Sequence, residues 1–272
     1  MSKLKLEPQK EQILKWYDEG KTFYWISKQL GEYEQAVSNL VKRYRNVPKW
    51  EPYKINEDYF KTIDSVDKAY HFGLIAADGA MVKATKSTWT MTISLQERDA
   101  HILHKMKRDM EAENPIATYT QQHRGRDTEF YTQSRLLISN QNFCKHLFDK
   151  DITPRKSKTL VGLSNHVQEE FIPDYIRGFF EGNGSISRTI TSGEQLRNYV
   201  SFRGSEEILQ DIKSSLGIEG GKIFFGKGST PNTGTYTWRF GAKEDVIKFK
   251  DMIYHDKVGD LYFPRKKDNF LW

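Results

Sequence analysis

The chain has 272 residues, a formal net charge of +6 and a sequence pI near 9.1. This length suffices for one large or two modest hydrophobic cores, and the basic balance is compatible with a polyanionic partner. The single cysteine, Cys144, excludes an intrachain disulfide and fits a reducing cytoplasm. No apolar run could span a membrane, and residues 1–6 lack a signal-peptide core, so membrane and secreted classes are not expected.

Residues 1–58 are expected to form an all-α helix-turn-helix domain followed by an extended linker. Helices are predicted over residues 9–17, 23–30 and 33–45, because apolar residues recur at helical spacing around Gly31. In a helix-turn-helix, the second helix of the pair enters the major groove of DNA. Its outward face would offer side chains suited to base edges and phosphates, namely Gln35, Ser38, Asn39, Lys42 and Arg43. The alternative is a small helical bundle used for protein contacts.

Residues 59–165 are predicted to form a helix–strand–strand–helix–strand–strand–helix unit. Its first helix can be capped by Asp64 or Ser65 and ends in residues 71–79 (HFGLIAADG). β-branched and aromatic content predicts the strands, and apolar periodicity predicts the helices. The expected strands are 80–84, 87–95, 116–122 and 130–138, and the expected helices are 97–113 and 140–149.

The same order recurs over residues 166–272. Pro173 can open the first helix, which ends in residues 176–184 (IRGFFEGNG). The expected strands are 185–191, 197–203, 222–226 and 235–240, and the expected helices are 206–216 and 243–254. The sequence therefore predicts an α+β protein, a pseudo-twofold tandem αββαββα repeat behind the N-terminal all-α domain. Such symmetry suits a DNA duplex, whose backbone is itself pseudo-twofold.

The two helix ends share a pattern of small residues. These lie four apart on one helix face, so two helix backbones could approach closely there: Gly73 and Ala77 in the first copy, Gly178 and Gly182 in the second. Each copy then ends in a short polar residue followed by the glycine that stops a helix, Asp78-Gly79 and Asn183-Gly184.

Helix C-terminal ends carry the negative pole of the helix dipole. A carboxylate added there, as at Asp78, makes a natural seat for a hard divalent cation such as Mg²⁺. The alternative is two amphipathic core helices with ordinary glycine caps.

The doubled pattern resembles the paired motifs of the LAGLIDADG homing endonucleases, over roughly residues 59–272. Gly73 and Gly178 match the first glycine of the motif, and the family's metal-binding acid falls at Asp78 and Asn183. The resemblance implies a monomeric, site-specific endonuclease, encoded by a mobile intron or phage element, whose sheets straddle the major groove of double-stranded DNA. It implies Mg²⁺ or Mn²⁺ as cofactor, with Ca²⁺ as a non-catalytic substitute.

Asn183 departs from the family pattern. Its amide oxygen can ligate a cation but carries no charge, so metal affinity there should fall. Three explanations stay open: a natural binding protein without activity, an enzyme that cuts one strand preferentially, or a deliberate Asp-to-Asn change that traps uncut DNA. Glu181 lies about 200° around the helix from Asn183 and is not expected to substitute.

The resemblance implies further catalytic residues. Lys156 and Lys266, in a repeated Pro-Arg-Lys, match the family's central lysines, and Gln96 and Arg203 match water-positioning residues. The alternative for the lysines is a solvated basic turn that grips phosphate. On the strands and loops the expected DNA-binding residues are Lys83, Thr90, Gln121, Arg124, Arg188 and Arg239, although a period-two polar face is also typical of any half-solvated sheet.

Three other functions compete with the endonuclease. Asn183 favours a non-enzymatic, sequence-specific DNA-binding regulator on the same scaffold. An RNA-splicing maturase is less compatible with a helix-turn-helix. An intein is disfavoured, because the ends of the sequence carry neither a splicing nucleophile nor a terminal His-Asn.

Overall fold

The computed structural model describes residues 6–46, 52–84, 88–122, 129–156, 160, 162–190, 196–226 and 234–271. The chain forms two compact units, Met1–Pro52 and Tyr53–Trp272.

The first unit is a three-helix bundle of α1 (Lys10–Asp18), α2 (Phe23–Leu30) and α3 (Glu34–Tyr44). Thr22 caps α2 by accepting a hydrogen bond from the Trp25 N–H, and Gly31 ends it with φ of 64°, a conformation that favours glycine. The helices enclose a small apolar core of Leu6, Ile13, Leu14, Ile26, Val37, Leu40 and Val41. The expected all-α domain is therefore present.

The first half of the second unit places one four-stranded antiparallel sheet against three helices. The helices are α4 (Val66–Asp78), α5 (Ala100–Asp109) and α6 (Gln141–Phe148). The strands are β1 (Ala80–Lys83), β2 (Trp89–Gln96), β3 (Ile116–Gln122) and β4 (Phe130–Ile138), paired in the order β1-β2-β4-β3. Ser65, one of the two expected caps, begins α4 by accepting from the Lys68 N–H.

The second half repeats this arrangement. Its helices are α7 (Ile172–Asn183), α8 (Glu206–Leu216), α9 (Lys243–Ile253) and the short α10 (Pro264–Lys267). Its strands are β5 (Gly184–Ile190), β6 (Leu196–Gly204), β7 (Lys222–Gly226) and β8 (Thr235–Phe240), in the matching order β5-β6-β8-β7. The tandem αββαββα fold class is confirmed. Short 3-10 turns lie at Glu7–Gln9, Glu97–Asp99, Leu163–His166, Glu169–Phe171 and Asp256–Val258.

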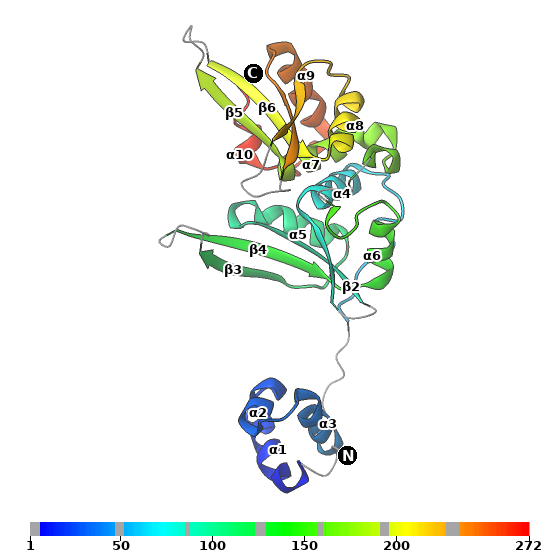
Figure 1. The fold of residues 1–272 in the computed structure, drawn as a ribbon. Coiled ribbons are helices and arrows are strands. Elements are labelled where there is room, and N and C mark those ends of the chain that lie inside the picture. Colours follow the sequence, from blue (N-terminus) through cyan, green and yellow to red (C-terminus); the bar gives the residue numbers. More distant parts are fainter. Residues whose placement is uncertain are drawn as a thin grey trace. The chain divides into compact units, whose positions relative to one another are not determined.

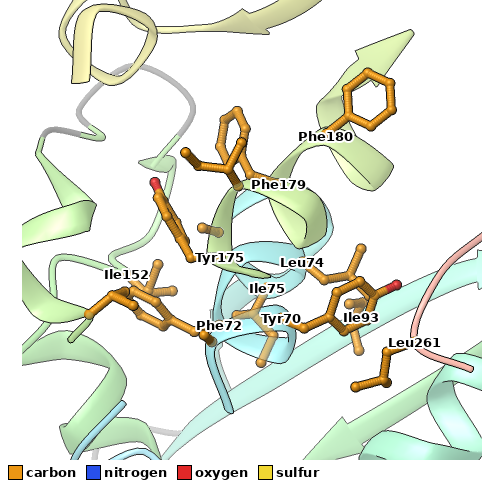
Figure 2. Close-up of a cluster of buried hydrophobic side chains, with 14 of the residues drawn as sticks. Tyr70, Phe72, Leu74, Ile75, Ile93, Ile152, Tyr175, Phe179, Phe180 and Leu261 are labelled. Atoms are coloured by element: carbon orange, nitrogen blue, oxygen red, sulfur yellow. The ribbon is translucent and has the colours of Figure 1, made fainter. Parts of the chain in front are cut away.

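Helices α4 and α7 pack side by side between the two sheets (Figure 1). Their contact is reciprocal, because a Cβ added at Gly73 would lie 2.0 Å from the Tyr175 carbonyl oxygen and one at Gly178 would lie 2.1 Å from that of Tyr70. Apolar side chains from both helices, including Leu74 and Phe179, surround the pair (Figure 2). The predicted small-residue contact is therefore present, and it brings the two motif ends together.

Each sheet has one face on the core and one open face. Met91, Ile93 and Leu95 of β2 are buried, whereas Gln96 is exposed and Thr92 and Ser94 are only partly covered. In the second sheet the core face includes Val200, Phe202, Trp238 and Phe240. Alternation with period two thus gives each half an open, polar sheet surface.

The division between the two units falls after Pro52, earlier than the boundary expected at residue 58. Asn56 and Glu113 donate backbone hydrogen bonds to Met110 and Lys54, which ties this part of the expected linker to the second unit. The expected boundary between the repeats, at residue 165, lies within the 3-10 turn Leu163–His166.

Candidate functional site

The paired helix ends bring Asp78 against the second motif. Asp78 is the last residue of α4, and its Cγ and Oδ2 atoms would lie 3.1 and 3.2 Å from a Cβ on Gly182 of α7. The residue is exposed, and its carboxylate forms no hydrogen bond with a described residue. The helix ends remove part of the carboxylate's water and raise the pKa of Asp78, while Lys266, Lys156 and Arg265 offset part of that rise.

Asn183 occupies the corresponding place at the end of α7. It is half-buried, and its amide forms no hydrogen bond with a described residue. It lines a small hollow of about 100 Å³ together with Ala76, Ala77, Phe179 and Arg203, among others. The hollow has room for a few water molecules beside the amide.

Lys156 and Lys266 lie under the two helix ends, where each is only 6% exposed. The Lys156 ammonium donates to the carbonyl oxygens of Ala77 and Gly79. The Lys266 ammonium donates to Phe180, Glu181 and Gly184, at 2.6–2.8 Å. Both therefore bind carbonyls left over at a helix C-terminus, where a cation also faces the negative end of the dipole.

Burial lowers the pKa of each of these lysines to about 8, and the charge of Asp78 counteracts part of the shift. The solvated basic turn considered from sequence is wrong, because the helix carbonyls draw both ammonium groups inward.

Gln96 and Arg203 lie at equivalent ends of β2 and β6, and both are exposed. Neither side chain hydrogen-bonds to a described residue. Arg203 lines the hollow beside Asn183, whereas Gln96 is not among the residues that line it.

A divalent cation fits this site only in part. Among the described residues no group of three or more His, Cys, Asp or Glu side chains could hold a metal ion. Asp78 and Asn183 offer one carboxylate and one amide oxygen, neither of them hydrogen-bonded to a described residue, so other oxygen ligands would have to complete a coordination shell.

Glu181, which was not expected to bind metal, is instead part of the packing between α7 and the C-terminal segment. Its carboxyl group is buried and accepts hydrogen bonds from the Tyr70 and Tyr254 hydroxyls and from the Phe263 N–H, which begins α10. Burial raises the pKa of Glu181 to about 7, against the lowering effect of the Tyr70 and Phe263 hydrogen bonds. Glu181 points away from solvent, so the expectation that it does not replace Asn183 agrees with its position.

One cross-repeat ion pair near the site was not foreseen. The Arg265 Nε donates to the buried Asp99 carboxylate at 2.9 Å, linking α10 of the second repeat to the start of α5 in the first. The repeated Pro-Arg-Lys was the only signal for it, since a buried acid nearby cannot be read from sequence.

On the first sheet, the expected DNA-binding residues lie in different places. Gln121 is on the open face, opposite Tyr131, and accepts from its hydroxyl at 3.1 Å. Thr90 is wrong, because it is 4% exposed and hydrogen-bonds to Ser139 at 2.7 Å.

Lys83 is exposed, but it shares the side of β1 that carries Met81 rather than the open face, and its ammonium lies 5.6 Å from the Trp89 ring centroid. Arg124 lies outside the described residues. Arg135 lies on the open face opposite Ser94 and was not among the residues expected to bind DNA, although the alternation along its strand places it there.

On the second sheet, Arg239 lies on the open face, with its guanidinium 4.3 Å from the Tyr199 ring centroid. Arg188 is a correction, because it points instead to the C-terminal segment. Its guanidinium donates to the carbonyl oxygens of Asp268 and Asn269.

In the first unit, the outer face of α3 carries exposed Gln35, Asn39 and Lys42. Gln35 donates to Asn39 at 2.9 Å, and Arg43 is exposed but pairs with Glu7 at 2.9 Å. Ser38 is a correction, because it is only 7% exposed and lies on the buried side of the helix beside Val37.

Comparisons with known proteins give structural matches only. No protein family model matches the sequence, and no curated protein is similar to it at a significant level. The LAGLIDADG homing endonuclease I-GzeII in complex with its DNA target has a TM-score of 0.46 and 13% identity, over 70% of this chain and 84% of that chain. I-SmaMI bound to uncleaved DNA with calcium ions has a TM-score of 0.44 and 15% identity, over 68% of this chain and 84% of that one. I-SmaMI bound to cleaved DNA has a TM-score of 0.44 and 15% identity, over 71% of this chain and 85% of that one.

In the described part of the chain, no helix is both long and apolar enough to cross a lipid bilayer.

Proposed function

We propose that this chain is a LAGLIDADG-type endonuclease that hydrolyses specific sites in double-stranded DNA with a divalent metal, and whose second metal-ligand position is Asn183. The observation that carries the proposal is the meeting of the two motif ends. Asp78 and Asn183 both end helices of one packed pair, and both side chains lack a protein partner among the described residues. A polar pair left free at the junction of two repeats is suited to an external ligand.

The charge of the two sheets supports DNA as that ligand. The strands β1 to β8, as bounded above, contain no Asp or Glu, although these make up 36 of the chain's 272 residues. The same strands place five Lys or Arg residues on the open faces: Arg135, Arg197, Arg203, Lys222 and Arg239. A surface without acids that presents polar and basic side chains matches the phosphates and base edges of a duplex.

The site residues would act on a scissile phosphate in distinct ways. A bound divalent cation supplies an activated water and charge relief at phosphoryl oxygens. Asp78 and Asn183 would hold it together with phosphate oxygens of the DNA, which complete the ligand set that the protein lacks. Lys156 and Lys266 would place positive charge beneath the helix ends, where negative charge develops. Arg203 would orient water in the hollow beside Asn183.

The neutral amide at Asn183 predicts that the two halves of the site bind metal with unequal affinity. A carboxylate binds a divalent cation more strongly than an amide, so the metal site on the Asn183 side would be the weaker one. We therefore expect this chain to nick one strand, or to bind without cutting.

A non-enzymatic DNA-binding regulator is the second candidate. It is favoured by Asn183, because an amide in place of a carboxylate removes one of the negative charges that would hold a metal. Under this reading Asp78 is a remnant and the sheets alone carry the function.

Strand-resolved cleavage separates the two candidates. A plasmid library with randomised sites is incubated with Mg²⁺ and this chain, Asn183→Asp, or Asn183→Asp combined with Asp78→Asn. An endonuclease altered at one ligand predicts double-strand cuts by Asn183→Asp, nicks or none by this chain, and loss of double-strand cutting in the double variant. If Asn183→Asp binds DNA tightly and cuts neither strand, the regulator is the better account.

We propose that the first unit extends the DNA contact through α3. Gln35, Asn39 and Lys42 are exposed there and suit base edges and phosphate. A chain of residues 53–272 should protect a shorter stretch of DNA than the whole chain does. An unchanged footprint would assign the first unit to protein contacts instead.

A further inference from the structure

The open faces of the two sheets differ in kind. The first sheet presents Ser94, Tyr119, Gln121, Tyr131, Gln133 and one cation, Arg135. The second presents Arg197, Arg203, Lys222 and Arg239 beside Tyr199. Hydroxyl groups such as those of Ser187, Thr189 and Ser201 lie on the second open face as well. The two surfaces thus differ in what accompanies the hydroxyls, which is amides and one cation on the first sheet and four cations on the second.

The polar side chains of the first sheet are held by one another. The Tyr119 hydroxyl lies 3.3 Å from the Ser94 hydroxyl and donates to Gln133 Oε1 at 3.1 Å. The Arg135 guanidinium lies 5.2 Å from the Tyr119 ring centroid. Side chains that are already ordered lose little conformational freedom on binding and reject bases that do not match their geometry.

A second link of the same kind lies farther along the sheet. The Tyr131 hydroxyl donates to Gln121 Oε1, so each of these two glutamines has its carbonyl oxygen bound by a tyrosine. Their amide N–H groups stay available to acceptors on base edges in the major groove.

The cations of the second sheet are less constrained. Arg197, Arg203, Lys222 and Arg239 form no side-chain hydrogen bond or ion pair with a described residue, and the Arg239 guanidinium lies over the Tyr199 ring. Lys222 and Arg239 are directly opposite each other on β7 and β8, and both line a hollow of about 540 Å³ whose rim also carries Asp245. Long, unpaired cations can follow phosphates of any sequence, because they need no fixed geometry.

We infer that the two halves divide the work on DNA: the first sheet discriminates bases in its half-site through the Tyr119–Gln133 and Tyr131–Gln121 pairs, and the second supplies affinity through phosphate contacts. This rests on the proposed function, since it assumes that both open faces meet one duplex. The sequence preference would lie mainly in one half-site, and the salt dependence mainly in the other.

A randomised-duplex selection with the full chain, in Ca²⁺ to prevent cutting, tests the division. The half-sites are assigned with the variant Thr120→Cys on β3, whose new thiol carries Fe–EDTA that cleaves the DNA nearby. The label goes to this thiol because Cys144 is buried. The expected result is a strong base preference in the half-site next to residue 120 and a weak one in the other.

Two variants sharpen the test, one in the cation set of the second sheet and one in the Tyr119–Gln133 pair of the first. Arg239→Gln should weaken binding to all sequences alike and reduce the slope of log affinity against log salt by about 1. Gln133→Ala should relax base preference by about tenfold at one position of the first half-site and leave the slope unchanged.

The possible failures are distinguishable. A base preference concentrated in the second half-site overturns the division alone. The same holds if Arg239→Gln loses base preference at one position while its salt slope stays unchanged. Absence of binding to any duplex overturns both the division and the proposed function.

Discussion

The backbone of Gly178 lies directly against the carbonyl oxygen of Tyr70, so that a Cβ added to the glycine would be 2.1 Å from that oxygen. Gly178→Ala must therefore push α4 and α7 apart, and we expect a loss of about 3 kcal/mol of folding free energy, as in severe overpacking. Urea unfolding measures it. Gly226→Ala is the control, because its Cβ would meet nothing closer than 3.6 Å. Equal stability of the two variants would contradict the close helix contact.

Tyr70 and Tyr175 hold equivalent places in the two motif helices but have different partners. The Tyr70 hydroxyl donates to buried Glu181, whereas the Tyr175 hydroxyl is buried without a partner among the described residues. The position that matches Glu181 in the first motif is Ala76, which offers no acceptor.

Phenylalanine substitutions should therefore separate the two tyrosines. Tyr70→Phe should cost about 1–3 kcal/mol because it leaves a buried carboxyl group short of a donor. Tyr175→Phe should change stability by less than about 0.5 kcal/mol or raise it. Thermal unfolding of the two variants side by side gives the comparison, and equal losses would mean that Tyr175 has a partner after all.

Local signals in the sequence were enough for the fold. Gly73 and Gly178 predicted the helix contact. The alternating residues predicted the ends of β2 and β6 to within one or two positions. These features depend on the spacing of apolar residues and on the positions of small residues, and both can be read directly from a sequence.

The side-chain environments could not be read in the same way. Ser38 and Thr90 are polar yet buried, because a neighbouring element covers them. Lys83 and Arg188 have the composition of DNA contacts, but the pleat turns them to the other side of their sheets. Lys156 is buried because backbone carbonyls distant in sequence accept hydrogen bonds from its ammonium group. Each case depends on tertiary partners rather than on the local pattern.

Glu181 predicts a pH dependence of stability. Burial raises the pKa of its carboxyl group to about 7, above the ordinary value of 4.5, so the folded chain holds a proton that the unfolded chain releases between these values. The free energy of unfolding should therefore fall as pH rises from about 4.5 to 7, by up to about 3 kcal/mol from this group. Glu181→Gln, which does not titrate, should lack that component in urea unfolding at pH 5 and pH 8. A constant difference between the two proteins across this range would exclude a raised pKa.

The two buried lysines predict a second titration at higher pH. Burial lowers the pKa of Lys156 and Lys266 to about 8, so the folded chain loses these protons while the unfolded chain keeps them up to the ordinary value of 10.5. The unfolded state then binds more protons, and the free energy of unfolding should rise between about pH 8 and 10.5.

Lysine-selective isotope labelling and NMR can follow these two side chains directly. Two lysine signals should titrate near pH 8, and Lys156→Met and Lys266→Met should each remove one of them. An Asn183→Asp enzyme that depends on the charged ammonium groups should also cut DNA more slowly above pH 8, while its DNA binding at that pH changes little. If all lysine signals titrate near 10.5, the ammonium groups are not buried under the helix ends, and their placement beneath Asp78 and Asn183 is wrong.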